Sequence, residues 1–443
     1  MSRAAKTGSI AETLQKAFQA HQAGQLSKAV RLYDAVLKKD PAQGDALNLK
    51  GIILQTRERH AEALALFERA AAALPNFPDV PFNMANTLKA LERNDEALAA
   101  YDKACALNPG YADARLNAGT LLHKLGRTTE AIASFREMVR IAPADPRAHY
   151  NLGVCLTESL PSEKEDKRER LIKEAEDAFK RALALNANDA NTHYAYANLL
   201  SAKGDHDNAI KHTQTAINLN PNWPEALSDL GERLRAADRF DEAINVLRRA
   251  ASLRPRDSII QYNLATALSD VEEYSEAERI FLDVIESDPS FVRAYANLGM
   301  VYKNTDRRDD AIALYEEALY IEPTLHQAYS NLAFIFRDEG WENASLALFD
   351  KALSYRDSDV AIAYHRGATL LRLGRLADGW PFYELRFDKA NERIFLRPTP
   401  PVYWGGEDLS GKSILVWTEQ GLGDEVLHGS MLPDVVARAQ TCI

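Results

Sequence analysis

Cysteine is scarce in this chain: its 443 residues include three, Cys105, Cys155 and Cys442, which lie far apart. An odd number of widely spaced cysteines favours neither a disulfide framework nor a metal site. We therefore expect no metal, no cofactor and a reducing, cytoplasmic location. Cys105 and Cys155 fall at positions that the repeat described below buries, and we interpret both as small core residues.

Long hydrophobic runs and an excess of positive charge are also absent. No stretch approaches the ~20 apolar residues of a membrane helix, and residues 1–15 have no apolar segment of signal-peptide length. The formal net charge is -11. Nucleic acid and anionic membrane surfaces are bound through clustered Lys and Arg, so neither is expected as the main partner.

A fixed spacing of prolines is the strongest pattern that is present. Eight prolines form two series with one constant step: Pro41, Pro75, Pro109 and Pro143, then Pro221, Pro255, Pro289 and Pro323. The gap between the two series, from Pro143 to Pro221, is two such periods plus ten positions. A period of about 34 residues resembles the tetratricopeptide repeat, a pair of antiparallel helices.

Three other positions keep the same spacing. Alanine stands at one fixed distance before the prolines, at Ala29, Ala63, Ala97, Ala131, Ala209, Ala243, Ala277 and Ala311. Glycine or alanine stands at twice that distance before them, at Ala17, Gly51, Ala85, Gly119, Ala197, Gly231, Ala265 and Gly299. In most units a large ring or aliphatic residue stands one helical turn after the alanine, at Tyr33, Phe67, Tyr101, Phe135, Leu247, Phe281 and Tyr315. Small residues let two helices approach closely, and the larger residue fills the space one turn further on.

The resemblance implies an all-α, right-handed tetratricopeptide superhelix, an α-solenoid whose first helices line a concave groove. We expect a tail over residues 1–9, ten repeats over 10–356 and a relaxed eleventh unit over 357–393. In repeat ten Ser345 replaces the alanine, and in the eleventh unit Gly379 takes that place. The charged insert near 160–170 should lengthen a loop or add a solvated turn, with a binding role as the alternative. Such arrays bind a protein or an extended peptide, and their exposed ends allow self-association.

A ladder of polar residues stands two positions before the small residue of each first helix. Its members are Asn83, Asn117, Asn151, Asp229, Asn263, Asn297 and Asn331, with Ala195 as a break and His365 in the eleventh unit. Asparagine is unfavourable inside helices, yet its amide can both donate to and accept from a peptide backbone. The array is similar to the repeat domain of O-linked N-acetylglucosamine transferases, which implies that these residues clamp a substrate peptide.

Two alternatives to that interpretation stay open. The asparagines could be a consensus feature of the repeat that bonds only its neighbours. A carboxylate clamp of the chaperone type is less favoured, because the residues one turn away (for example Asn86, Thr120, Val154 and Met300) include no cation. Arg147 and Arg293 are read as isolated cations.

The chain changes character after residue 393. Residues 394–410 are a Pro/Gly-rich linker, and Ser413–Thr418 is a short apolar run typical of a buried strand. A turn containing Gly421, Gly423 and Asp424 follows, and then a helical stretch over about 425–439. Strand, glycine turn and helix open a Rossmann-like unit, whose turn could hold an anion.

Residues 411–443 resemble the start of a heptosyltransferase-like glycosyltransferase domain that follows tetratricopeptide repeats in bacterial proteins. That resemblance implies that Asp424 is a catalytic base, with Gly421 and Gly423 shaping the turn. Asp424 could equally cap the helix that follows it, and His428 is read as a surface or interface residue. We expect the chain to be an amino-terminal fragment or a truncated product without transferase activity of its own.

Two functions are compatible with these features. The first is a peptide-binding solenoid that recruits the acceptor for a bacterial glycosyltransferase-like protein. The second is a non-catalytic scaffold or assembly protein.

Overall fold

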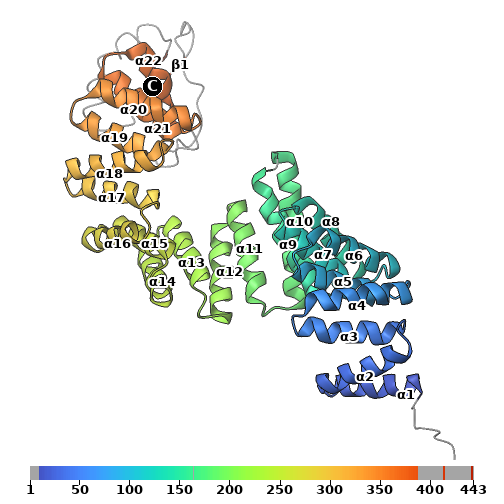
Figure 1. Cartoon of the computed structure of the whole chain (residues 1–443). Coiled ribbons are helices and arrows are strands. Elements are labelled where there is room, and N and C mark those ends of the chain that lie inside the picture. Colours follow the sequence, from blue (N-terminus) through green and yellow to red (C-terminus); the bar gives the residue numbers. More distant parts are fainter. Residues whose placement is uncertain (1–8, 163, 388–412, 415–440, 443) are drawn as a thin grey trace, which may run out of the picture. The chain divides into compact units, whose positions relative to one another are not determined.

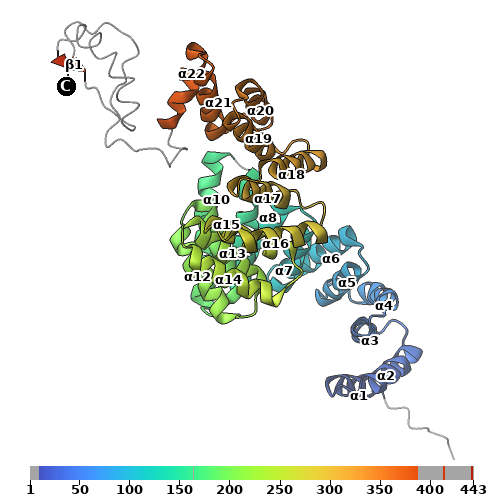
Figure 2. The same cartoon turned by 90° about the vertical axis from the view of Figure 1, so that its left-hand side faces the viewer.

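In a computed structural model of the protein, the structure describes residues 9–162, 164–387, 413–414 and 441–442. Antiparallel helical hairpins follow one another along the chain (Figures 1 and 2). The chain divides into two compact units, Met1–Pro255 and Arg256–Ile443. Each unit is described by itself.

The first unit consists of helices only, within its described residues. They are α1 (Ile10–Gln22), α2 (Leu26–Lys39), α3 (Gly44–Thr56), α4 (His60–Ala73), α5 (Asp79–Ala90), α6 (Asn94–Leu107), α7 (Ala112–Lys124), α8 (Thr128–Ile141), α9 (Pro146–Ser159), the 3-10 turn η1 (Leu160–Ser162), α10 (Glu165–Leu185), α11 (Ala190–Lys203), α12 (His206–Leu219), α13 (Pro224–Ala236) and α14 (Phe240–Leu253). The odd-numbered helices are the first helices of the hairpins, and the even-numbered helices are the second.

The second unit continues the hairpins and adds a pair of strands. Its elements are α15 (Ser258–Asp270), α16 (Tyr274–Ser287), α17 (Val292–Asn304), α18 (Arg308–Ile321), α19 (His326–Asp338), α20 (Glu342–Tyr355), α21 (Val360–Arg372), α22 (Leu376–Tyr383), the 3-10 turn η2 (Glu384–Phe387), β1 (Ser413–Ile414) and β2 (Thr441–Cys442). The two strands pair in parallel, with Ser413 opposite Thr441 and Ile414 opposite Cys442. The all-α class predicted for the repeats is confirmed.

The core follows the positions that the period predicts. The periodic alanines of the second helices are fully buried, and so are the larger residues that stand one turn after them. In the hairpin that carries the insert, Ala175 and Phe179 take these two places and are buried to the same extent. Cys105 and Cys155 are buried as predicted, and burial raises the pKa of the Cys155 thiol to about 12.

Glycine occurs in the first helices where a ring would otherwise collide with a side chain. A Cβ on Gly119 would lie 2.7 Å from Cε1 of Phe135, and a Cβ on Gly299 would lie 2.7 Å from Cε1 of Tyr315. Both rings are fully buried, so they cannot move aside into solvent. The small residue and the ring are therefore two halves of one contact between the helices of a hairpin.

The turns between the helices pass through a left-handed residue, but glycine is not always there. Gly24, Gly126 and Gly204 have positive φ, which glycine adopts without strain. Five turns place an acidic residue in this conformation instead: Glu58, Glu92, Asp238, Glu272 and Asp306, with φ between 56° and 64°. The periodicity of the helices thus tolerates a residue that carries backbone strain at the turn.

The charged insert, for which we expected a longer loop or a solvated turn, begins with the 3-10 turn η1 and continues as the first residues of α10. Helix α10 has 21 residues, against 14 in α8 and α12. Arg168 in its first turns donates to the carbonyl of Ala202 at 3.2 Å, which ties the extension to α11. Leu171 is buried. Because Glu, Lys and Arg are good helix formers, the insert continues the helix once one side chain anchors it.

Repeat ten keeps its close helix contact although Ser345 replaces the alanine. The Ser345 hydroxyl donates to the carbonyl of Ala333 at 2.7 Å and the residue is fully buried. In the last hairpin two glycines face each other: a Cβ on Gly379 would lie 3.0 Å from the carbonyl oxygen of Gly367. The helices α21 and α22 therefore approach backbone to backbone.

Candidate functional site

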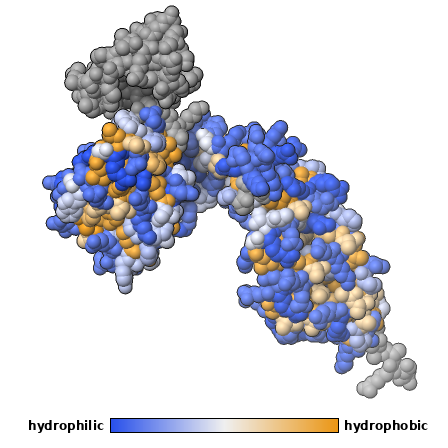
Figure 3. All heavy atoms as spheres, turned by 90° about the horizontal axis from the view of Figure 1, so that it is seen from above, coloured by the Kyte–Doolittle hydropathy of each residue, from blue (hydrophilic) through white to orange (hydrophobic). Residues whose placement is uncertain are grey.

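The candidate site is the face formed by the first helices of the hairpins. These helices contact each other directly within each unit, as in α3–α5 and α7–α9 of the first and α15–α17 and α17–α19 of the second. The polar ladder predicted from the sequence lies along this face. In the view of Figure 3, hydrophilic and hydrophobic residues are mixed over the helical surface rather than separated.

In the first unit, two ladder amides link consecutive repeats. The Nδ2 of Asn83 donates to Oδ1 of Asn48 on α3 at 3.1 Å. The Nδ2 of Asn117 donates to Oδ1 of Asn86 on α5 at 2.9 Å. The same oxygen accepts the hydroxyl of the buried Tyr101 at 2.5 Å. These amides have fixed orientations because their N–H groups are held by the preceding repeat.

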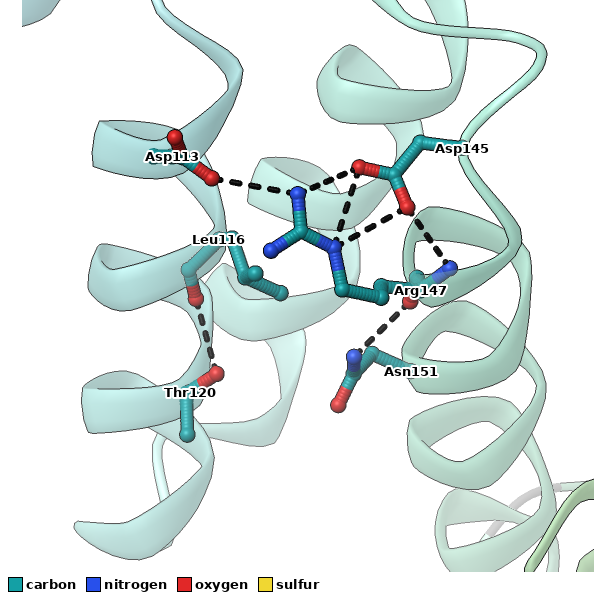
Figure 4. A network of polar contacts seen from close by, with 6 residues as sticks. All are labelled: Asp113, Leu116, Thr120, Asp145, Arg147 and Asn151. Carbon is teal, nitrogen blue, oxygen red and sulfur yellow. Dashed lines mark hydrogen bonds and ion pairs between the residues drawn. The ribbon is translucent and has the colours of Figure 1, made fainter.

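Asn151 is bonded differently, within a network of polar contacts (Figure 4). Its Nδ2 donates to the backbone carbonyl of Arg147 at 2.8 Å. The Arg147 guanidinium lies between Asp113, at 3.1 Å, and Asp145, at 2.7 Å, and the hydrogen bond from Arg147 lowers the pKa of Asp145. Arg147 is therefore not the isolated cation that we expected.

Asp229 occupies the ladder position where asparagine is missing. Its Oδ2 accepts the Tyr194 hydroxyl at 2.6 Å and lies 3.9 Å from the Arg233 guanidinium. Burial raises the pKa of Tyr194, and the hydrogen bond to Asp229 raises it further. A carboxylate fits this position because a donor and a cation both face it.

In the second unit the ladder residues are partly or fully buried. Asn297 donates from Nδ2 to the Tyr262 hydroxyl at 3.0 Å and to Oγ1 of Thr266 at 3.1 Å, both on α15. Asn263 is 6% exposed. Burial raises the pKa of Tyr315, and Asn331 opposes that rise. Asn297 thus repeats, in this unit, the link between repeats that Asn117 makes in the first.

Two cations and a ring that the sequence analysis missed, Lys303, Arg337 and Phe334, lie beside this part of the ladder. Lys303 and Arg337 both lie over the ring of Phe334, at 5.3 and 5.1 Å from its centroid. The ring of His365 meets Phe334 edge to face, with centroids 4.7 Å apart. Lys303 and Arg337 stand almost two turns after Asn297 and Asn331, beyond the positions one turn away at which a cation is expected for a carboxylate clamp.

The remaining predicted site residues lie outside the described residues. These are Asp424, Gly421 and Gly423, together with the linker 394–410 and most of 411–443. Over the ranges that the structure does describe, no three His, Cys, Asp or Glu side chains gather as metal ligands would. None of the helices in those ranges is both long and apolar enough to cross a membrane.

Family comparisons match this arrangement to one class of protein. Three models described as tetratricopeptide repeat match the chain, the first at residues 20–78 and 82–146, the second at 234–299 and the third at 190–222 and 292–325. Together the matched residues make up more than half of the chain. The chain is therefore a tetratricopeptide-repeat protein, a solenoid scaffold of the kind that binds protein or peptide partners.

One curated relative is similar over a short stretch. Protein FlbA of Caulobacter vibrioides is 48% identical over 73 residues, which are 16% of this chain and 12% of FlbA. The match thus spans about an eighth of the length of that relative. Solved structures that resemble the present chain include yeast Tom70, PilF of Pseudomonas aeruginosa and MamA.

The structural similarities are low. Tom70 is 14% identical, over 82% of this chain and 96% of its own, with a TM-score of 0.40. PilF is 18% identical over 49% and 94%, with a TM-score of 0.41. MamA is 25% identical over 37% and 96%, with a TM-score of 0.33. The chain is placed among tetratricopeptide-repeat proteins by the sequence matches and by its helical hairpins.

Proposed function

We propose that the first-helix face binds the backbone of an extended peptide through the polar ladder. The observation that carries the proposal is the fixed orientation of the ladder amides. Asn117 and Asn297 each commit N–H groups to the preceding repeat, which leaves their Oδ1 atoms as acceptors in the same register of successive helices. A peptide in extended conformation has backbone N–H groups to donate to such acceptors.

The same hydrogen bonds also suit the alternative in which the asparagines only join repeats. The two functions differ in what the amide oxygen does, because joining repeats uses only the N–H groups. A useful variant must therefore weaken the link between repeats and keep the amide. Thr266→Ala weakens this link without touching Asn297 itself, because it deletes one of the two acceptors of Asn297 and leaves the Tyr262 hydroxyl.

The test compares Asn297→Ala with Thr266→Ala in the full chain. Peptides selected from a random library on the wild-type protein are measured by fluorescence anisotropy. Asn297→Ala should weaken binding by about tenfold, the effect of one to two hydrogen bonds, while Thr266→Ala stays within about twofold. Equal binding by both variants, with equal loss of melting temperature, would contradict the clamp and favour the scaffold.

We further propose that this array recruits the acceptor of a glycosyltransferase-like protein. Support comes from the residues near Gly421 and Asp424 that resemble such a domain, and from the parallel pairing of β1 with β2. Parallel strands need a crossover between them, usually a helix, and the segment 415–440 between the two strands is long enough to supply one. The alternative is a scaffold whose terminal domain performs no chemistry.

Transfer is tested with a protein that contains this chain and whatever follows it. Selected peptides are incubated with nucleotide sugars, and their masses are measured. A mass gain that is lost in Asp424→Asn would support transfer with Asp424 as the base. If no peptide gains mass while the peptides still bind, the peptide-binding function is kept and the transferase proposal is rejected.

A further inference from the structure

The second unit brings two cations, an imidazole and a phenyl ring together on three neighbouring first helices. Lys303 comes from α17, Phe334 and Arg337 from α19, and His365 from α21. Lys303 and Arg337 share the ring of Phe334, at 5.3 and 5.1 Å from its centroid. The ring thus gives both cations a common apolar support.

The charges of this cluster are poorly balanced by carboxylates. Within the part of the chain that the structure describes, Lys303 makes its cation–ring contact but no ion pair. Arg337 has one carboxylate neighbour there, Asp338, which lies 3.5 Å away on the same helix and is 45% exposed. By contrast, Arg307 of the same unit lies 2.7 Å from Glu278 and 2.9 Å from Asp310.

Both cations affect the protonation of His365. Burial is the first cause that lowers its pKa, followed by the charges of Arg337 and Lys303, and the result is a pKa of about 4. At neutral pH the imidazole is therefore uncharged and can donate one ring N–H. The cluster offers two positive charges and a neutral donor, in a protein whose net charge is -11.

We infer that Lys303, Arg337 and His365 form a binding site for the carboxylate side chain of an Asp or Glu residue in an extended peptide. The inference rests on the peptide-binding function proposed above, because Asn331 lies on the same helix one turn before Phe334. A planar guanidinium and an ammonium are suited to one carboxylate, and the Phe334 ring can contact the methylene groups that carry it. The site would add a side-chain preference to a ladder that recognises only backbone.

The structure favours a carboxylate over a nucleic acid strand. A strand presents phosphates in series and is bound through a row of cations along a groove. In the ladder register next to the cluster the residues are instead Asn297, Asn331 and His365. Two cations that share the Phe334 ring suit a single carboxylate better than a series of phosphates.

The test uses the full chain and two short Gly-Ser peptides that differ only in carrying glutamate or glutamine. Binding is measured by fluorescence anisotropy at physiological salt for the wild type and the double variant Lys303→Met, Arg337→Met. The matched control is Arg279→Met, Arg308→Met, which removes the same charge from the second helices α16 and α18. Lys303→Arg serves as the conservative variant.

The glutamate peptide should bind the wild type more tightly than the glutamine peptide. The cluster variant should lose about tenfold or more of the affinity for glutamate and little for glutamine, since charge-assisted hydrogen bonds are lost. The control should stay within about twofold of the wild type, and Lys303→Arg should keep the preference for the glutamate peptide because it keeps the positive charge.

Several results would overturn the inference, and they separate it from the ladder. If both peptides bind with equal affinity and Asn297→Ala weakens the binding of both, the ladder function is supported and the carboxylate site is rejected. If neither peptide binds, both fall. An equal loss in the cluster variant and the control would reduce the effect to net charge. A single-stranded oligonucleotide that binds more tightly than the glutamate peptide, through the same two cations, would replace the peptide with nucleic acid.

Discussion

Replacing Gly367 by alanine should destabilise the last helical hairpin, because backbone occupies the space that a side chain needs. A Cβ at this position would lie 2.6 Å from Cβ of Phe382, 2.9 Å from the backbone nitrogen of Tyr383 and 3.0 Å from the carbonyl oxygen of Gly379. Two of these three atoms are backbone. Relief therefore requires α22 to move away from α21 as a whole.

Two opposing terms decide the magnitude. Alanine in place of glycine inside a helix gains about 1 kcal/mol of helix propensity. Overpacking a close contact costs about 1–3 kcal/mol, and the upper part of that range applies when backbone must move. We expect a net loss of about 1–2 kcal/mol from these two terms. The loss should be confined to the last hairpin, because each repeat of an array contacts only its neighbours.

Hydrogen exchange of individual amides measures this local loss. Amides of α21 and α22 should exchange faster in Gly367→Ala, while those of α15 and α16 are unchanged. The matched control is Gly44→Ala, also buried in a first helix, where the new Cβ would meet only side-chain atoms of the half-buried Leu74. That variant should cost less than Gly367→Ala, because the Leu74 side chain can change rotamer whereas α22 must move as a whole. An unchanged or slower exchange in Gly367→Ala would refute the backbone-to-backbone approach of these helices.

Three other predictions concern the turns, the core and pH. Gly126→Ala should lower the free energy of unfolding in urea by about 1 kcal/mol, because φ is +73° there. Glu58→Gly should instead raise it by a few tenths of a kcal/mol. Equal effects of the two changes would contradict the proposed strain at these turns. Ala277→Leu should cost about 1–3 kcal/mol by overpacking a fully buried position; the exposed Ala313→Leu in the same unit is its control. The pKa of His365 is about 4 when folded, below its usual 6.5 when unfolded, so the unfolded chain binds the extra proton and stability should fall as pH drops from about 6.5 to 4. Hydrogen exchange of α21 at both ends of that range should show a smaller fall in His365→Gln, and an equal fall would contradict the shifted pKa.

Periodic features of this molecule could be predicted because each repeat meets the same neighbours. The small residue, the large residue that packs against it and the closing proline recur in most hairpins, so a single period locates most of them. The same period also relates the two residues of the ion pair that the sequence analysis missed. Asp113 and Arg147 are one full period apart, which places them side by side on consecutive first helices, and their opposite charges make the pair readable.

Features that break the period were harder to predict. The insert shifted Ala175 and Phe179 out of register, and its charges suggested a loop although they suit a helix equally well. The acidic residues in the left-handed turns keep the register of Gly24 and Gly126, but their residue type gave no signal, since glycine is the usual residue there. Lys303 and Arg337 are periodic with each other, but their neighbourhood depends on Phe334 and His365, which belong to different registers. Only the packing of three helices brings these four together.

The hydrogen bonds of the ladder join the two interpretations of the asparagines rather than choosing between them. An amide whose N–H groups are held by the preceding repeat loses rotational freedom when the protein folds, not when a ligand binds. Its oxygen is then preorganised, and a peptide that donates to it has less entropy to lose. In Asn297 the partners Tyr262 and Thr266 supply that order. If the oxygen is an acceptor for peptide, losing one partner should weaken binding slightly, through disorder, while losing the amide should abolish one contact outright. The ratio of these two losses of affinity, rather than either one alone, distinguishes an asparagine that binds peptide from an asparagine that only joins two repeats.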